Sequence, residues 1–341
     1  MTLIGGADMA KVGRMNGCQT THPMTLLACD LGGTRLKIGV VRDHEILAHA
    51  VEPADSKLPL ALHLPVLKAV WLRLLAQLSL SPSDCAGISM AYPSIIDASS
   101  GRVLAAFGKF TDAVDLDLRA WAQSELGLPL AIENDARMAL IGEWRAGAGR
   151  GCDDLVMMTL GTGLGTAAII EGRVLRGTHG QAGILGGHLS LHYNGGRVCT
   201  CGNLGCAEAE ASTASLTHLA HARSDFARSP LAAEPLLDFA AVFRHATAAD
   251  PCAVALRDHS IHVWATLAVN LIHAYDPARL IIGGGIMASA AVILPAIRAH
   301  VARHANTPWG QVQIVASTLA DNAALVAGQW LLLDPSPKQP T

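Results

Sequence analysis

The chain has 341 residues, more than one hydrophobic core usually supports, so we expect two lobes that share one polypeptide. Hydrophobic residues make up 51% of the chain and aromatic residues 4%, and this aliphatic composition is typical of an α/β protein with helices packed on parallel strands. The net charge is only −3 and the basic residues are scattered, which argues against a nucleic-acid partner.

Residues 1–24 lack the apolar core of a signal peptide, and we expect them to form a flexible leader of a cytoplasmic protein. Residues 280–297 carry no charge, but the glycines at 283–285 and Pro295 favour a buried strand, a turn and a helix over a membrane span. We therefore expect no contact with a membrane.

Two hydrophobic hairpins organise the chain. In residues 25–51 two strands flank a first glycine turn, and in residues 155–170 two strands flank a second. Their spacing of about 130 residues indicates a duplicated lobe, with each half facing one shared cleft. The remaining pattern predicts helices over residues 60–80, 116–126, 135–146, 287–304 and 322–333, and a helix-rich stretch over residues 208–274. It predicts strands over residues 86–90, 130–133, 280–282 and 311–317.

Both glycine turns are candidate phosphate sites, because glycine lets backbone N–H groups approach an oxygen with no Cβ in the way. The first turn is residues 32–34 and the second is residues 161–163. Each turn alone also fits an ordinary hairpin, but the two together favour phosphate, and neither matches the P-loop pattern. Asp30 ends the strand before the first turn, where it either holds Mg²⁺ through water or caps the turn.

Asn134 and Asp135 follow the strand at residues 130–133 directly. A carboxylate at a strand end that faces a cleft can accept the proton of an attacking hydroxyl, and phosphoryl transfer depends mostly on such positioning. Spacing alone favours the simpler interpretation that the pair caps the following helix.

Three cysteines fall within eight residues, a spacing that indicates a metal site in a chain without other disulfide signals. Cys199, Cys201 and Cys206 supply three thiolates, and His188 completes a tetrahedral Cys₃His zinc site of structural type, although His179 and His192 are alternative fourth ligands. The competing interpretation is three small buried hydrophobic side chains. Glu208 follows closely, and it fits either a ligand of substrate hydroxyls or a first-turn helix residue.

These motifs, in this order, resemble the ROK family of bacterial sugar kinases and related repressors over residues 26–333, above all in the loop of residues 199–208. The resemblance implies a two-lobed actin-like ATPase (ribonuclease H-like) fold with duplicated βββαβα-type lobes, ATP with Mg²⁺ as donor, Zn²⁺ and a homodimer. It implies Asp135 as catalytic base, and Asn134, His188 and Glu208 as sugar ligands. It places ATP against Asp30, Gly32, Gly33, Thr34, Arg35, Gly161, Thr162, Gly163, Gly284 and Gly285.

The expected division is a small lobe of residues 25–120 plus 320–334, a large lobe of residues 121–319 with the zinc loop at 186–208, and a tail at 335–341. The acceptor side departs from the family pattern: Leu185 stands where a sugar-binding glutamate is usual, Ser94 where a glycine is common, and residues 107–110 replace a Pro-Asn loop.

The function expected is an ATP-dependent kinase that transfers the γ-phosphoryl group to a hydroxyl of a hexose or amino sugar, with glucose as the default. The alternatives are a non-catalytic sugar-binding or regulatory protein, and a kinase for an unusual acceptor such as N-acetylmannosamine or fructose. The repressor branch carries an N-terminal helix-turn-helix, and no helical pair precedes the first strand here, so we expect no DNA-binding module.

Overall fold

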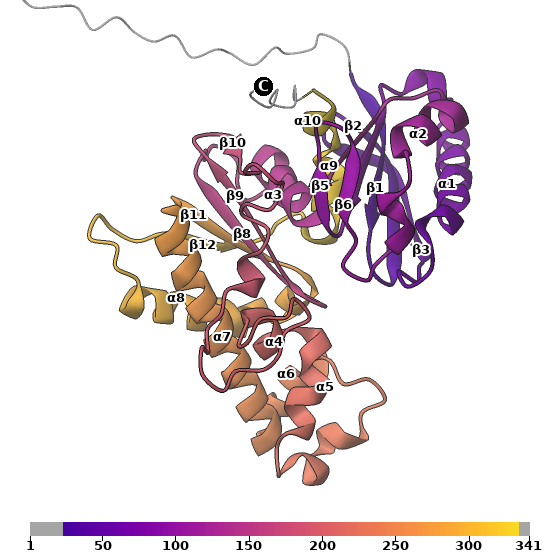
Figure 1. The fold of residues 1–341 in the computed structure, drawn as a ribbon. Coiled ribbons are helices and arrows are strands. Elements are labelled where there is room, and N and C mark those ends of the chain that lie inside the picture. Colours follow the sequence, from indigo (N-terminus) through magenta and orange to yellow (C-terminus); the bar gives the residue numbers. More distant parts are fainter. Residues whose placement is uncertain (1–22, 334–341) are drawn as a thin grey trace, which may run out of the picture.

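The computed structural model describes residues 23–333. The expected leader, apart from its last two residues, and the expected tail therefore lie outside the described residues. Two five-stranded sheets dominate the described chain, each covered by helices (Figure 1).

The first sheet has the order β3-β2-β1-β4-β7. Its β1 pairs antiparallel with β2 and parallel with β4, and β4 pairs parallel with β7. The glycine turn forces the chain back after β1, and the buried run that follows the first helix returns as β4 beside β1. The strands are β1 (Thr25–Leu31), β2 (Arg35–Arg42), β3 (Glu45–Pro53), β4 (Ile88–Tyr92) and β7 (Leu130–Asn134).

The second sheet repeats this plan with the order β10-β9-β8-β11-β12. Again the first strand pairs antiparallel with the next strand and parallel with a later one, so the predicted duplication is confirmed. The strands are β8 (Leu155–Leu160), β9 (Leu164–Ile170), β10 (Arg173–Val174), β11 (Arg279–Gly283) and β12 (Gln313–Ala316). A separate small hairpin joins β5 (Ile95–Asp97) to β6 (Arg102–Ala105).

The helices fall into three groups (Figure 1). The first sheet carries α1 (Leu64–Gln77) and α2 (Leu118–Leu126), and the region between the two sheets holds α3 (Asp135–Ala146), α9 (Ala323–Val326) and α10 (Gly328–Leu333). The rest pack with the second sheet or extend from it: α4 (Ala207–Ala211), α5 (Thr213–His221), α6 (Phe239–Thr247), α7 (Pro251–Tyr275) and α8 (Ala290–His304).

Some predicted boundaries differ from the structure. The strand β7 belongs to the first sheet, beyond the residue 120 at which the expected small lobe ends. The helix predicted over residues 322–333 is two short helices, α9 and α10, with Ala327 between them.

Two helical stretches, Leu60–Gln77 and Gly285–His304, are long and apolar enough to cross a membrane by length and composition, a test that core helices also pass. The uncharged stretch at residues 280–297 begins inside β11, which lies between β8 and β12 in the second sheet, so it is not one continuous helix.

Helix α3 joins the two sheets because it has two buried faces. Trp144 packs into a cluster with β8 and β11 of the second sheet, whereas Met138 and Ile141 pack on the opposite side against α9 and α10. The approach to α9 is so close that a Cβ on Gly142 would lie 2.0 Å from the carbonyl oxygen of Ala323. The first residue of α3 is therefore anchored between the two halves of the molecule.

Candidate active site and metal centre

The carboxyl ends of three parallel strands meet at one edge of the first sheet. The pairing of β1, β4 and β7 places Asp30 beside Ala91, and Ala91 beside Glu133. Asp135 follows two residues later, at the start of α3. Strands lie about 4.8 Å apart, so two carboxylates that are 105 positions apart in the sequence, 135 minus 30, share one edge.

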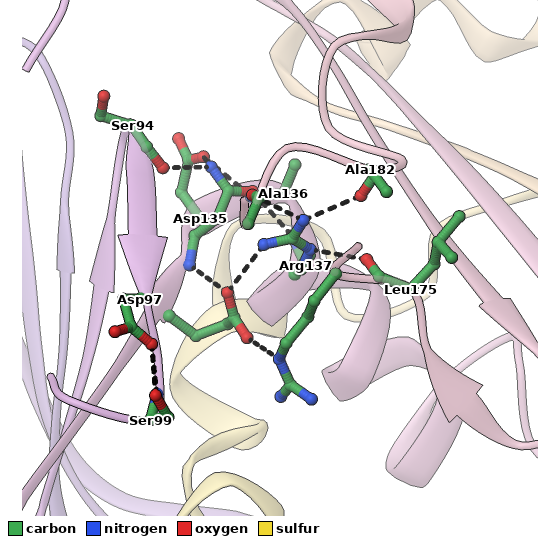
Figure 2. Close-up of polar contacts among 12 residues, drawn as sticks. Ser94, Asp97, Ser99, Asp135, Ala136, Arg137, Leu175 and Ala182 are labelled. Atoms are coloured by element: carbon green, nitrogen blue, oxygen red, sulfur yellow. Dashed lines mark hydrogen bonds and ion pairs between the residues drawn. The ribbon is translucent and has the colours of Figure 1, made fainter. Parts of the chain in front are cut away.

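Asn134 and Asp135 make different contacts at the beginning of α3, the helix that Figure 2 shows starting at Asp135. The Asn134 side-chain oxygen accepts a hydrogen bond from the Arg137 N–H at 3.2 Å, so Asn134 is the helix N-cap. Its amide nitrogen donates to the Ser94 carbonyl oxygen at 3.1 Å and to Asp135 Oδ1 at 3.0 Å. The Ala136 N–H also donates to Oδ1, at 2.8 Å. Oδ2 of Asp135 makes no hydrogen bond with a described residue.

Electrostatics make Asp135 a better base than an ordinary aspartate. Burial, and then the negative charge of Asp30, raise the pKa of its carboxyl to about 6, while the positive charge of Lys109 and hydrogen bonds from backbone N–H groups oppose the rise. A base is most effective when its pKa lies near the working pH. Asp135 is therefore still ionised at neutral pH but binds a proton far more readily than a surface aspartate.

The first glycine turn connects β1 to β2, and the candidate residues at positions 30–35 stay together there. The Gly32 N–H donates to the Arg35 carbonyl oxygen at 2.9 Å, and a Cβ on Gly32 would lie 2.6 Å from that oxygen, so the tight turn requires glycine. Lys37 Nζ holds Asp30 at 3.1 Å and also the carbonyl oxygen of Asp321 at 3.0 Å. This lysine holds the Asp30 carboxylate beside the first glycine turn.

The second glycine turn connects β8 to β9, and Glu208 binds it directly. Oε2 of Glu208 accepts from the Leu164 N–H at 2.9 Å, and a Cβ on Gly163 would lie 2.4 Å from the same oxygen. The first two backbone N–H groups of α5 donate to the carbonyl oxygens of Gly161 and Thr162. Glu208 is thus linked to the second turn, a contact that its sequence spacing did not indicate.

The second hairpin also reaches the start of α3. A Cβ on Gly165 would lie 3.3 Å from the Ala136 side chain, so β9 passes directly beside the residue that follows Asp135. Gly284, after β11, has φ 91° and lies so close to the Leu160 carbonyl oxygen that a Cβ would be 2.2 Å from it. Gly285 has open space where a Cβ would be. Two strand ends of the second sheet therefore converge here as well.

The predicted metal ligands form one cluster. The ligand atoms of His188, Cys199, Cys201 and Cys206 all lie within 4.8 Å of one another. Sγ of Cys201 is 3.7 Å from Sγ of Cys206, and Sγ of Cys199 is 3.4 Å from Nδ1 of His188. A tetrahedral zinc ion about 2.3 Å from each sulfur would separate two sulfurs by roughly 3.8 Å. The donor set and its spacing therefore fit zinc.

The alternative fourth ligands lie outside this cluster. His192 is more than half exposed, and its Nδ1 is 3.8 Å from Glu210. His179 is exposed and does not join the group of ligand atoms. The imidazole beside the three sulfurs is that of His188, whose Nδ1 is the ring nitrogen near Cys199.

A buried ionic network beside Asp135 was not predicted from the sequence. Glu133 and Arg137 are fully buried and pair at 3.1 Å, and Arg176 pairs with the second oxygen of Glu133 at 2.7 Å. Arg137 also donates to the carbonyl oxygens of Leu175 and Ala182 (Figure 2), which ties residues 175–182 to α3. The only available signal was the i, i+4 spacing of Glu133 and Arg137.

Comparison with known proteins places this geometry in context. The model of the ROK family matches residues 26–334. A glucokinase of Thermotoga maritima is 30% identical over 91% of this chain and 97% of its own length, and a xylose repressor of Bacillus subtilis is 26% identical over 76% of this chain and 64% of its own. The solved ROK family glucokinase of Streptomyces griseus, in complex with glucose and AMPPNP, superposes with a TM-score of 0.73 at 27% identity, over 90% of this chain and 98% of that one.

Proposed function

This chain belongs to the ROK family, and we propose that it is an ATP-dependent sugar kinase of the two-lobed actin-like ATPase fold. The observation that carries the proposal is the position of Asp135 at the strand edge shared with the first glycine turn. Its carboxyl has a raised pKa, and one of its oxygens makes no hydrogen bond with a described residue. The glucokinase relatives, which cover nearly the whole chain, support the same reaction.

Asp135 acts as the general base in this proposal. As the acceptor oxygen bonds to the γ-phosphorus, the bond from phosphorus to the β–γ bridging oxygen breaks, and the acceptor proton passes to Oδ2 of Asp135. The hydrogen bonds from Asn134 and Ala136 to Oδ1 hold the carboxylate in one orientation. We assign Asn134 to both helix capping and acceptor positioning.

The donor binds between the two glycine turns. In this proposal the N–H groups of residues 33–34 and 162–163 bind the phosphates, because the Gly32 and Gly161 N–H groups already donate inside their own turns. Gly284 and Gly285 lie on the adenosine side. Asp30, held by Lys37, would carry the Mg²⁺ that accompanies ATP, because a carboxylate is the ligand this hard cation prefers. Bound Mg²⁺ supplies positive charge against the phosphate oxygens.

Zinc would be held by His188, Cys199, Cys201 and Cys206, and it would act structurally because four protein ligands close its coordination shell. Bound zinc would hold together the loop at residues 186–208, whose two ends carry His188 and Glu208. These two side chains then reach the acceptor from a rigid support: His188 through Nε2, and Glu208 through the oxygen that does not accept from Leu164.

The acceptor side supports a sugar but leaves its identity open to experiment. Leu185 lies half-buried just before His188, so one expected hydroxyl ligand is replaced by an apolar side chain. We propose a hexose or amino sugar that presents an apolar edge or a bulky substituent at this position.

The test is sugar-dependent ADP formation with a panel of neutral hexoses and N-acetylated amino sugars, with thermal stabilisation measured in parallel. We expect at least one sugar to support turnover, and Asp135→Asn to abolish it while sugar still stabilises the variant. The xylose repressor relative makes a sugar-binding regulator the rival function. Stabilisation of the wild type without turnover by any sugar would establish that rival instead.

A further inference from the structure

The loop at residues 107–110 lies between the first glycine turn and the end of β4. The Phe110 N–H donates to the Ser56 carbonyl oxygen at 2.6 Å, and the Ser56 N–H donates to the Gly33 carbonyl oxygen at 3.1 Å, so this loop is linked to the first glycine turn. On its other side the Tyr92 hydroxyl donates to the Lys109 carbonyl oxygen at 3.1 Å. Tyr92 ends β4 and pairs with Asn134, the neighbour of Asp135.

The loop is held rigidly in an unfavourable backbone conformation. Phe107 has φ 39° and Phe110 has φ 47°, a region of backbone conformation that non-glycine residues adopt only under strain. Phe110 is fully buried, and its ring contacts His63 edge-on at a centroid distance of 5.2 Å and lies 6.3 Å from Tyr92. Such strain persists only where the surroundings impose it, and the side chain it presents between the two phenylalanines is Lys109.

Lys109 is half-buried, and it makes no ion pair with any described residue. The Lys109 carbonyl oxygen accepts from Tyr92, and Tyr92 pairs with Asn134, so Lys109 lies at the strand edge that carries the proposed base. In agreement with this position, its positive charge lowers the pKa of Asp135. Lys37, the other lysine at this edge, is committed to Asp30 and Asp321. The two carboxylates at this edge would repel an incoming phosphoryl group, and Lys109 is a cation on the same side that forms no salt bridge within the part of the chain that the structure describes.

We propose that Lys109 is a further catalytic residue, whose ammonium binds the oxygens of the γ-phosphoryl group while it passes from ATP to the acceptor. The inference rests on the proposed kinase function. Charge spreads over the three equatorial oxygens during transfer, and a pre-positioned cation in a dehydrated site stabilises that charge more than the ground state. Lys109 keeps its protons throughout; the acceptor proton goes to Asp135, and the electron pair of the broken bond leaves with ADP.

The experiment compares Lys109→Met with Lys57→Met, a matched control in which an exposed lysine near the same loop is replaced. Lys109→Met should lower kcat by about 10²–10³-fold, the usual effect of removing one group that stabilises developing charge, with KM for ATP and sugar changed by less than about threefold. Lys109→Arg should recover part of the rate. Lys57→Met should keep wild-type kinetics.

A second readout excludes a merely structural role. Lys109 and Asp30 are the charged side chains that act on Asp135, and Lys109 opposes the rise in its pKa, so Lys109→Met should move the acid limb of the kcat/KM profile to higher pH. Wild-type kcat with an unmoved acid limb would overturn the inference, as would a raised sugar KM at unchanged kcat, which would make Lys109 an acceptor ligand. Loss of activity in Asp135→Asn but not in Lys109→Met would leave the kinase function standing and remove only this inference.

Discussion

Asp135 is expected to destabilise the fold that holds it. Its pKa is about 6 in the folded protein, whereas an aspartate in an unfolded chain titrates near 3.9, and each unit corresponds to about 1.4 kcal/mol. Ionised Asp135 therefore costs the folded state up to about 3 kcal/mol at neutral pH. Asparagine keeps the shape and the oxygen that accepts from Ala136 but carries no charge. We predict that Asp135→Asn raises the free energy of unfolding by about 1–3 kcal/mol near pH 7.5, while it abolishes turnover.

The stability difference between Asp135→Asn and wild type should depend on pH. Because the folded pKa is higher than the unfolded pKa, the folded state binds more protons between about pH 4 and pH 6, and the stability contributed by protonated Asp135 is lost as the pH rises through this window. The difference between variant and wild type should be small near pH 4 and complete above about pH 7. Urea unfolding followed by circular dichroism at a series of pH values measures it.

Asp97 provides a control of opposite sign. Burial raises the pKa of Asp97, but hydrogen bonds from Ser100 and Ser99 outweigh burial and leave the pKa lowered. Asp97→Asn should therefore destabilise the protein at neutral pH, and that loss should shrink as the pH falls below the ordinary aspartate pKa of about 3.9.

An Asp135→Asn variant that is less stable than wild type near neutral pH, or a difference that does not change with pH, would refute the reasoning.

Three further predictions concern the parts that support the site. Cys201→Ser should reduce zinc from one ion per chain to none by elemental analysis, whereas Cys152→Ser should retain it, and full metal content in Cys201→Ser would contradict the ligand assignment. Arg137→Met should lower the free energy of unfolding by about 3–5 kcal/mol and expose residues 175–182 to proteolysis, because it leaves the Glu133 carboxylate buried without this partner. Gly142→Ala should destabilise by more than about 3 kcal/mol in urea unfolding, since its Cβ would meet the backbone of α9; a stability within about 0.5 kcal/mol of wild type would show that α3 and α9 separate freely.

The features that sequence predicted are those set by local spacing. The two hairpins follow from hydrophobic strands on either side of glycine turns, and the structure places Gly32 and Gly163 where a Cβ would collide with neighbouring atoms. The metal cluster could be predicted because its three thiols occupy one short loop, and in the structure His188 lies beside them. In each case the residues that define the feature are neighbours along the chain or on adjacent strands.

The features that sequence missed depend on contacts between distant segments. The sequence marks Lys109 only as part of a loop that departs from the family pattern. Its position near the end of β4 depends on the buried Phe110 and on the hydroxyl of Tyr92, which are tertiary contacts. The bond from Glu208 to the second turn requires α4 to pack beside β9. The membership of β7 in the first sheet likewise follows from pairing with β4, which no local pattern specifies.

The two interpretations of Asn134 and Asp135 are compatible, because Asn134 caps the helix and the proposed base is the next residue. A helix that begins at a strand end needs one side-chain oxygen to satisfy its first N–H groups, and Asn134 provides it. Had Asp135 provided the cap, a further backbone N–H would stabilise its charged form, and the pKa of its carboxyl would fall. Because Asn134 caps the helix and donates to Oδ1 of Asp135, Oδ2 makes no hydrogen bond within residues 23–333, and burial and the charge of Asp30 keep the pKa raised. Exchanging the two residues, as Asn134→Asp with Asp135→Asn, should therefore preserve the helix but remove the base.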